Sequence, residues 1–194
     1  MYKIFKILIK FPYRMICLIW NFFQLKRYNT VYFPSLKING RIYISGQNIN
    51  IGKNVRINSC SKSNPIGGDS RTILRTCRDG RIIIGNNVGI SNSAIVSYSG
   101  IKINDNVLIG NSCKIYDTDF HSLNITDRIK DSVETIKSVS IEIGEGVFIG
   151  AHSIILKGVV IGENSVIGAG SVITKSIPAN EIWGGNPAQY IRKL

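Results

Sequence analysis

The residues best suited to chemistry in this 194-residue chain are an imidazole and two carboxylates in one short stretch. The stretch reads Asp117-Thr-Asp119-Phe-His121, and His121 is one of two histidines in the chain. A neutral imidazole takes up a proton near neutral pH, which suits a general base. Either carboxylate is close enough in sequence to accept the other ring N–H of His121 and fix its tautomer, or to shape the turn instead. We therefore take His121 as the first residue to consider for a functional role.

The elements that must position this histidine are built on a repeat of six residues. Aliphatic side chains recur at this spacing over 143–177, at Ile143, Ile149, Ile155, Ile161, Ile167 and Ile173. A helix has a period of 3.6 and a flat strand a period of 2, so a strict period of six indicates a chain that turns a corner every six residues. Three such sides close one coil of a parallel β-helix, and the fold class is all-β.

The positions between the aliphatic residues agree with this geometry. The residue four places after each aliphatic one is small or β-branched, as at Val147, Ser153, Val159, Ser165 and Ser171. Gly, Asn and Asp recur at the corners, where most side chains resist the backbone conformation. Each coil is stabilised by stacking on the next, about 4.8 Å away.

His121 lies where this repeat is interrupted. Residues 31–178 form the expected β-helix, but 116–138 leave it as a long loop. A loop of that length expelled from a regular solenoid usually carries function. Residues 179–194 are expected to cap the open coil with an extended strand, a turn and a short basic helix.

Residues 1–30 are apolar and basic and predict an amphipathic helix. Lys3, Lys6, Lys10 and Arg14 are spaced three or four apart and share one helical face, while Pro12 is expected to kink or restart the helix. The longest uncharged run, 15–25, is too short to span a bilayer, which needs about twenty residues. Two interpretations remain: a helix lying in the membrane interface, or a helix packed on the end of the β-helix or on a partner subunit.

The charge of the chain is concentrated at the same end. The net charge is +12, and eleven lysines and arginines precede Asp69, the first acidic residue. This segregation favours an anionic surface as partner for residues 1–68, and no nucleic-acid-binding motif accompanies it. The four cysteines, Cys17, Cys60, Cys77 and Cys113, show no CxxC spacing, so reduced thiols in a cytosolic protein are expected.

The chain resembles the hexapeptide-repeat acyltransferases, and among them the sugar O-acetyltransferases of the maltose, galactoside and nodulation-factor type. The resemblance covers about residues 36–194. It rests on the repeat, on the expelled loop with its histidine, and on the closing Gly185-Asn-Pro187-Ala with Arg192. It implies a left-handed parallel β-helix, a homotrimer, and acetyl-CoA as acyl donor in a groove between subunits.

The resemblance also assigns roles to residues of this chain. His121 corresponds to the general base, with Asp119 or Asp117 as the carboxylate that orients it, and Asn92 to an asparagine that faces the base and the acceptor sugar. The alternative is that Asn92 is one more corner residue. The cofactor contacts correspond to Gly150, Ala151, Ala169, Thr174, Lys175 and Arg192, with the two cations positioned for the CoA phosphates.

The chain departs from the soluble sugar acetyltransferases in residues 1–30, which moves the expected acceptor towards a saccharide held at a membrane. The leading interpretation is an acetyl-CoA-dependent O-acetyltransferase in bacterial surface polysaccharide assembly, cytoplasmic and peripheral on the inner face of the cell membrane. The alternatives are N-acetylation of an amino sugar, transfer of another acyl group, or a non-catalytic membrane-docked scaffold. A metal hydratase needs about three histidine ligands, and the chain offers His121 and His152, so we expect no metal.

Overall fold

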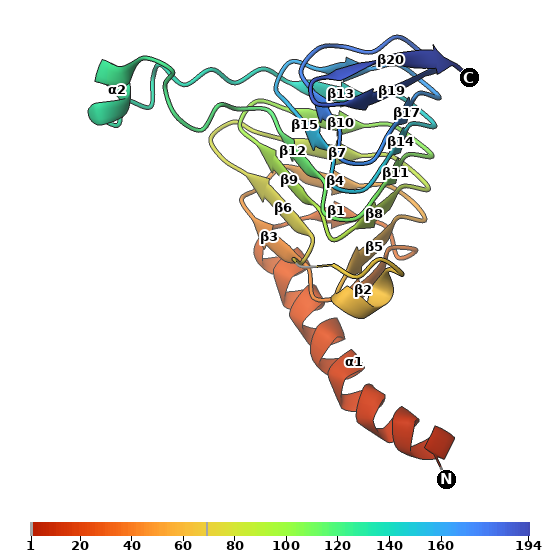
Figure 1. Cartoon of the computed structure of the whole chain (residues 1–194). Coiled ribbons are helices and arrows are strands. Elements are labelled where there is room, and N and C mark those ends of the chain that lie inside the picture. The colour runs from red at the N-terminus through yellow and green to blue at the C-terminus, as the bar shows by residue number, and fades with distance from the viewer. Residues whose placement is uncertain (1, 69) are drawn as a thin grey trace.

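The chain folds into a three-sided parallel β-helix (Figure 1). A computed structural model describes residues 2–68 and 70–194, with side chains described from residue 12 onward. Successive strands belong to successive sides, so each sheet collects every third strand of the solenoid. We name the sides sheets A, B and C, and the corners between them A/B, B/C and C/A in chain order.

The strands of the three sheets are short and, apart from β20, pair in parallel from coil to coil. Sheet A contains β1 (Val31–Tyr32), β4 (Ile49–Ile51), β7 (Ile82–Ile84), β10 (Ile101–Ile103), β13 (Ile141–Ile143) and β16 (Val160–Ile161). Sheet B contains β2 (Lys37–Gly40), β5 (Arg56–Ser59), β8 (Gly89–Ser91), β11 (Leu108–Ile109), β14 (Phe148–Ile149), β17 (Val166–Ile167), β19 (Glu181–Gly185) and β20 (Ala188–Lys193). Sheet C contains β3 (Tyr43–Ser45), β6 (Ile73–Thr76), β9 (Ala94–Ser97), β12 (Lys114–Tyr116), β15 (Ile154–Ile155) and β18 (Val172–Ile173).

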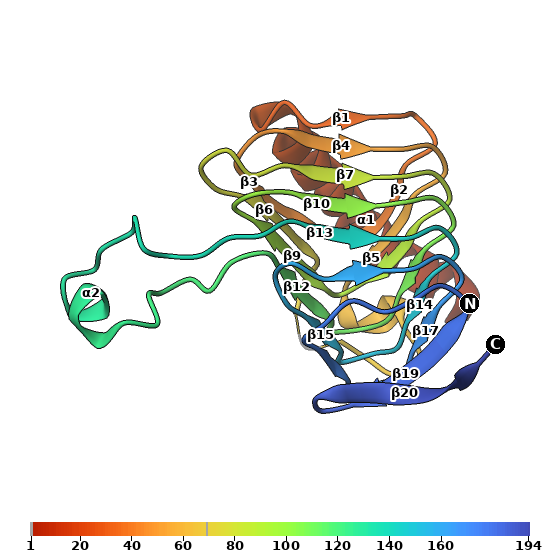
Figure 2. The same cartoon turned by 90° about the horizontal axis from the view of Figure 1, so that it is seen from above.

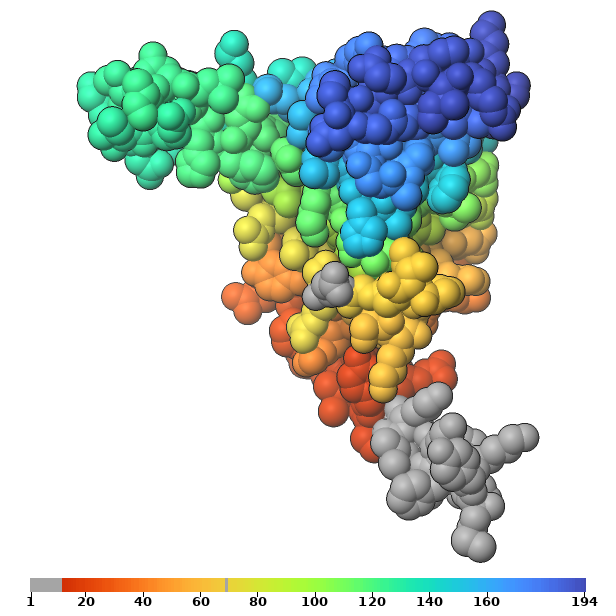
Figure 3. Space-filling model, viewed as in Figure 1, coloured from red at the N-terminus to blue at the C-terminus, as the bar shows by residue number. Residues whose placement is uncertain are grey.

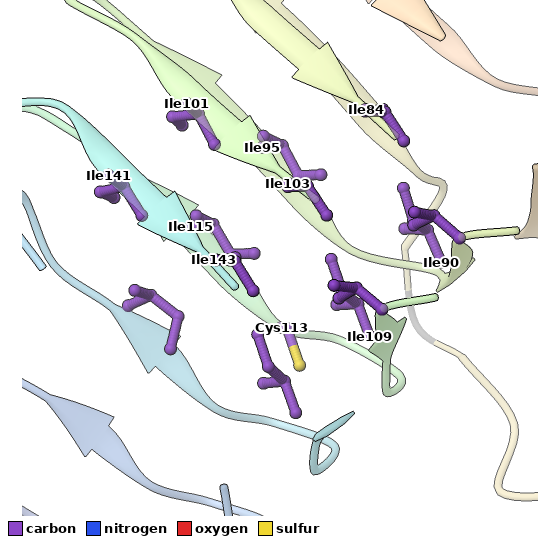
Figure 4. Packing of buried hydrophobic residues seen from close by; sticks show 14 of the residues in the cluster. Ile84, Ile90, Ile95, Ile101, Ile103, Ile109, Cys113, Ile115, Ile141 and Ile143 are labelled. Carbon is purple, nitrogen blue, oxygen red and sulfur yellow. The ribbon is translucent and has the colours of Figure 1, made fainter. Parts of the chain in front are cut away.

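The predicted aliphatic positions form the core (Figure 4). Isoleucines in register stack along the axis: Ile101 pairs with Ile82 and Ile141, and Ile103 with Ile84 and Ile143. Each of these side chains is almost completely buried. Burying such a side chain contributes about 1.5–3 kcal/mol, so the repeated isoleucine is the main source of stability.

The corners explain the small and amide residues of the repeat. At the A/B corner Asn54, Asn87 and Asn106 adopt left-handed backbone angles of 57°, 57° and 61°. Their side-chain amides form a ladder, because Asn54 donates to Asn87 at 3.2 Å and Asn87 donates to Asn106 at 3.0 Å. Asparagine tolerates this conformation better than most residues and also links the coils.

Helix α1 (Tyr2–Arg27) covers the first coil with side-chain amides. The amide of Asn21 donates to the Gly40 carbonyl at 2.9 Å and accepts from the Ile42 N–H at 3.0 Å. The side-chain Oε1 of Gln24 accepts from the Ile44 N–H at 2.8 Å. These bonds satisfy backbone groups that an open sheet edge would leave unpaired.

Of the two interpretations of the N-terminal segment, packing on the β-helix describes the end of α1, and the membrane interface stays a prediction. Its end packs on the β-helix, and Cys17, Asn21 and Leu25 are buried there. The helix continues through Pro12 and does not restart. The expected basic face at Lys3, Lys6 and Lys10 lies outside the described side chains. No described helix is long and apolar enough to cross a membrane.

The C-terminal residues correct one expectation. The short basic helix predicted at the end of the chain is wrong, because 188–193 form strand β20, paired antiparallel with β19. Strand β19 in turn extends sheet B by pairing with β17, and Trp183 closes the end of the core. A hairpin satisfies its backbone groups against the existing sheet, whereas a helix of so few residues is marginal without a partner.

Two loops leave the solenoid, at different corners. Residues 60–72 leave the B/C corner and include a short 3-10 turn, Ser61–Ser63. Residues 117–140 leave the C/A corner and carry helix α2 (Ile125–Ile129) far from the β-helix body (Figure 2). This second loop holds His121.

Candidate active site

His121 lies at the base of the loop 117–140, immediately beyond sheet C. Its side chain is exposed, and its backbone N–H donates to the Asp119 carbonyl at 2.7 Å. Phe120, between them, has a φ of 61°, which is unusual for an aromatic residue and indicates that the surroundings hold the turn. The imidazole is therefore presented to the outside from a defined turn. The loop that follows protrudes from the body of the β-helix (Figure 3).

The ring of Phe120 anchors this turn to sheet C. It packs on Tyr116 with ring centroids 5.3 Å apart and on Tyr98 at 6.0 Å. Aromatic pairs at these separations contribute about 0.5–1.5 kcal/mol beyond the area they bury. Burial raises the pKa of the Tyr98 phenol, and its hydrogen bond with the Cys77 thiol adds to the effect. The residue before His121 is thus fixed by packing.

Asp117 serves the C/A corner and not the imidazole. Its fully buried carboxylate accepts from the backbone N–H groups of Tyr98 at 2.7 Å, Ser99 at 2.9 Å and Gly100 at 2.6 Å. It also accepts from the Ser97 hydroxyl at 2.9 Å. The expelled loop removes backbone acceptors from this corner, and the Asp117 carboxylate accepts in their place. The corner amides are therefore not left without acceptors where the loop leaves the solenoid.

Asp119 is tied to the next coil. Its Oδ1 accepts from Lys157 Nζ at 2.6 Å, with 19% of the aspartate and 28% of the lysine side chain exposed. Its Oδ2 is buried and has no partner among the described residues. Neither Asp117 nor Asp119 makes a hydrogen bond to the His121 ring in the described chain. Of the two carboxylates, only Asp119 has an oxygen left to accept one.

The base of the loop is closed like a short hairpin. Thr118 and Ser138 form an antiparallel bridge, and the Asp119 N–H donates to the Lys137 carbonyl at 3.1 Å. The Gly158 N–H donates to the Val139 carbonyl at 2.9 Å. Lys157 and Gly158 therefore attach the loop from the following coil, although no sequence motif marked Lys157 as part of the site.

Asn92 lies at the other end of sheet C, at the B/C corner between β8 and β9. It is completely buried, its φ is 47°, and its amide donates to the Ser70 carbonyl at 2.6 Å. Its Oδ1 is buried and unpaired within the described residues. Gly68 sits directly over the side chain, since a Cβ there would lie 2.6 Å from Asn92 Cγ. Within one chain the fold places Asn92 and His121 at different corners, B/C and C/A.

Three of the expected cofactor residues form one strip along the B/C corner. Gly150, Ala151 and Ala169 are neighbours, because a Cβ on Gly150 would lie 2.5 Å from the Ala169 amide nitrogen. Glycine is therefore required at 150 for the coils to stack. The amide N–H groups of Ala151 and Ala169 donate to no acceptor in the described chain. The strip presents small side chains and free backbone donors.

The remaining expected contacts lie elsewhere on the same end of the solenoid. Thr174 and Lys175 are exposed at the C/A corner, where Lys175 Nζ stands 5.1 Å from the centre of the Trp183 ring. Arg192 is exposed on β20, opposite Ile182. The cations of Lys175 and Arg192 thus both lie at the hairpin formed by β19 and β20. His152, exposed at the B/C corner with a φ of 62°, lies at a different corner from His121.

A family model described as bacterial transferase hexapeptide (six repeats) matches residues 140–175. The chain is also similar to solved structures of AntD, an N-acyltransferase from Bacillus cereus. One of these, a complex with dTDP-4-amino-4,6-dideoxyglucose and coenzyme A, is 28% identical, with a TM-score of 0.67, over 87% of this chain and 86% of that one.

Two further structures agree in architecture. A galactoside acetyltransferase in complex with coenzyme A is 31% identical, with a TM-score of 0.52, over 78% of this chain and 65% of that one. A hexapeptide transferase family protein from Anaplasma phagocytophilum, at 24% identity and a TM-score of 0.60, covers 85% of this chain and 79% of its own and shows the fold alone. The three-sided coil is thus the left-handed parallel β-helix of hexapeptide transferases.

Proposed function

We propose that this chain, a hexapeptide-repeat acyltransferase, transfers an acetyl group from acetyl-CoA to a saccharide hydroxyl in the assembly of a bacterial surface polysaccharide such as a capsule, O-antigen or exopolysaccharide. The observation that carries the proposal is the exposed imidazole of His121, held at the base of the loop by Phe120 and Asp119. The imidazole takes the hydroxyl proton as the oxygen attacks the thioester carbonyl. The CoA sulfur leaves and is protonated in turn.

The strip at Gly150, Ala151 and Ala169 supports the assignment of acetyl-CoA as donor. Small side chains let an extended pantetheine arm approach the backbone, and the free N–H groups there suit its amide carbonyls or the oxyanion of the transition state. Lys175 and Arg192 are assigned to the phosphates of CoA. AntD and the galactoside acetyltransferase bind coenzyme A in their structures.

A homotrimer is part of the proposal, because a single subunit keeps the proposed residues apart. Asn92 and His121 lie at opposite ends of sheet C. The protruding loop also exposes apolar side chains that a neighbouring subunit would cover, with Leu123 77% and Ile129 78% exposed. Identical contacts around a three-fold axis close a ring of three subunits, so that no contact surface stays unpaired. Mass measurement in solution tests this, and an active monomer contradicts it.

We also propose that α1 places the enzyme on the inner face of the cell membrane. Away from its packed face, the helix exposes large apolar side chains, at Met15, Ile16, Leu18, Ile19, Phe22 and Phe23. Arg14, Lys26 and Arg27 flank them, which suits an anionic lipid surface. Because the packed face caps the first coil, point substitutions are a cleaner test than deletion of residues 1–28. Ile19→Asp with Phe23→Asp should abolish sedimentation with anionic vesicles, whereas the control Ile66→Asp, on the exposed loop 60–72, should not.

N-acylation of an amino sugar is the second candidate. The observation that favours it is the similarity to AntD, an N-acyltransferase whose structure holds an amino-sugar nucleotide. The chemistry at His121 is the same for both acceptors, since a general base removes a proton from either oxygen or nitrogen. Parallel assays with hydroxyl and amino acceptors separate the two.

The test of the proposed function is the His121→Ala variant. Loss of the base should lower kcat by about two to four orders of magnitude and leave the KM for acetyl-CoA nearly unchanged. CoA release is followed with a thiol reagent on an established acceptor. His152→Ala is the matched control and should retain activity. Equal activity of His121→Ala and the unaltered protein at neutral pH would refute the mechanism.

A further inference from the structure

A group of arginines and tyrosines lies on the outer side of sheet C and at its C/A corner, between α1 and His121. We call Tyr43, Arg75, Arg78 and Tyr98 the Arg–Tyr cluster. The Arg75 guanidinium stands 5.7 Å from the centre of the Tyr43 ring, and the Arg78 guanidinium stands 5.6 Å from that of Tyr98. Both guanidinium groups are close enough to the Tyr98 phenol to influence its ionisation. Two exposed cations are thus held by aromatic rings in fixed positions.

The two cations have no carboxylate partner in the described chain. The ion pairs found there are Lys102–Glu142 and Lys157–Asp119, which involve neither arginine. The nearby Asp117 carboxylate is buried and taken up by the corner amides. Asp79 follows Arg78 in sequence and is exposed, without an ion pair in the structure. The cluster therefore presents unneutralised charge.

The cluster is linked to His121 through the strands of sheet C. Arg75 is in register with Val96, and Val96 with Tyr116, so Arg75 and Tyr116 are two strands apart, about 10 Å at the usual spacing. Tyr116 and Tyr98 both touch Phe120, the residue before His121. Arg78 also donates to the Val133 carbonyl at 3.0 Å, from the far side of the loop. One continuous surface runs from the cations to the imidazole.

The chemistry of this surface selects its ligand. Arginine presents several donors in a planar fork that matches phosphate oxygens, and prior fixation of the side chains lowers the cost of binding. A neutral saccharide alone would leave both cations without a counter-ion. A second protein is disfavoured because the surface holds no apolar anchor comparable to that of the loop 117–140.

We propose that the Arg–Tyr cluster binds the phosphate or pyrophosphate of an activated saccharide, so that the attached sugar reaches His121. The acceptor is then a glycosyl phosphate, carried either by a nucleoside or by a membrane lipid, and not a free sugar or a finished neutral polymer. The position of the cluster between α1 and His121 fits both carriers. This inference rests on the proposed acyl transfer and adds the class of acceptor.

The test compares acceptors with and without phosphate in the full-length protein. The variants are Arg75→Gln and Arg78→Gln, with Arg56→Gln as control, an exposed arginine at the start of β5 in sheet B. The acceptor pairs are a nucleoside-diphosphate sugar against the free sugar, and a polyprenyl-pyrophosphate saccharide in vesicles against the same saccharide released from its lipid. CoA release gives KM and kcat, and titration with inorganic pyrophosphate gives binding directly.

We expect each cluster variant to raise the KM for the phosphate-bearing acceptor about ten- to hundredfold and to weaken pyrophosphate binding similarly, with the KM for acetyl-CoA unchanged. Arg75→Lys should restore part of the affinity, and Arg56→Gln should match the unaltered protein. The acceptor whose KM rises in the cluster variants, nucleoside-linked or lipid-linked, identifies the carrier of the phosphate. The inference is refuted if free and phosphorylated sugars are equal acceptors, or if the cluster variants match the control. If instead no saccharide of any kind is acylated, the proposed function itself has failed.

Discussion

Asp117→Asn is the sharpest test of how the loop is attached to the solenoid. One carboxylate oxygen, Oδ1, accepts the Tyr98 N–H, and Oδ2 accepts from Ser97, Ser99 and Gly100. An asparagine keeps one acceptor oxygen. Placed at the Oδ2 position, that oxygen retains three partners, but its NH₂ group then faces the Tyr98 N–H, donor against donor. The reverse orientation loses the Ser99 and Gly100 bonds.

The magnitude follows from this count. One buried N–H without an acceptor costs about 1–3 kcal/mol, and the surviving bonds lose their charge assistance. We expect a destabilisation of about 2–4 kcal/mol. For a chain of this length about 1 kcal/mol corresponds to about 2–4 °C in Tm, so the melting temperature should fall by about 5–15 °C.

The measurement is thermal unfolding at one fixed protein concentration, because oligomerisation makes Tm depend on concentration. Asp119→Asn is the control. It removes the charge of one ion pair but keeps an amide oxygen that still accepts from Lys157 Nζ, so its Tm should fall less than that of Asp117→Asn. A Tm for Asp117→Asn within about 1 °C of the unaltered protein, or equal to that of Asp119→Asn, would refute the structural role of this carboxylate.

Three further outcomes are expected. Lys157→Met should lower kcat several-fold while sparing the KM for acetyl-CoA, since it frees the turn that presents the imidazole. Restoration of kcat by Lys157→Arg would distinguish a positioning role from a packing defect. An unchanged kcat in Lys157→Met would contradict the positioning role of Lys157. Gly150→Ala should lower the free energy of unfolding by about 1–3 kcal/mol, because its Cβ would meet the Ala169 nitrogen at 2.5 Å. Gly168→Ala, whose Cβ would meet its nearest atom at 3.5 Å, should leave that free energy nearly unchanged. Urea unfolding of both variants measures the difference. Cys113 is completely buried and burial raises the pKa of its thiol, so a thiol reagent should label it only on unfolding; mass spectrometry of the native protein checks this.

The repeat could be predicted from the sequence because one physical requirement recurs in every coil. Each inward position needs an aliphatic side chain, and the small residue that follows leaves room for it. The burial of Ile143 and Ser153 could therefore be predicted from their spacing, without knowledge of any long-range contact. The expelled loop was equally visible, since its residues simply fail to repeat. The C-terminal hairpin was not. Residues 188–193 have no strong preference, and the free edge of β17 and β19 decides their conformation.

The candidate site stays a prediction at the level of single residues. The loop and its histidine were visible in the sequence, the resemblance supplied the role of general base, and the comparison with known acyltransferases agrees with the reaction class. The sequence offered no way to separate Asp117 from Asp119, because both lie within a few residues of the histidine. Only the fold buries one against the amides of Tyr98 to Gly100 and pairs the other with Lys157.

Local spacing and the polarity of single residues were enough to predict the period, the core and the presence of an expelled loop. Which groups meet depends on how the coils stack. Lys157 reaches Asp119 from the next coil, and α1 supplies the amides of Asn21 and Gln24 to the first coil. Arg75 and Arg78 come to lie on the surface that leads to His121. Such contacts join residues tens of positions apart, and stacking of the coils, which no local pattern encodes, sets their distances.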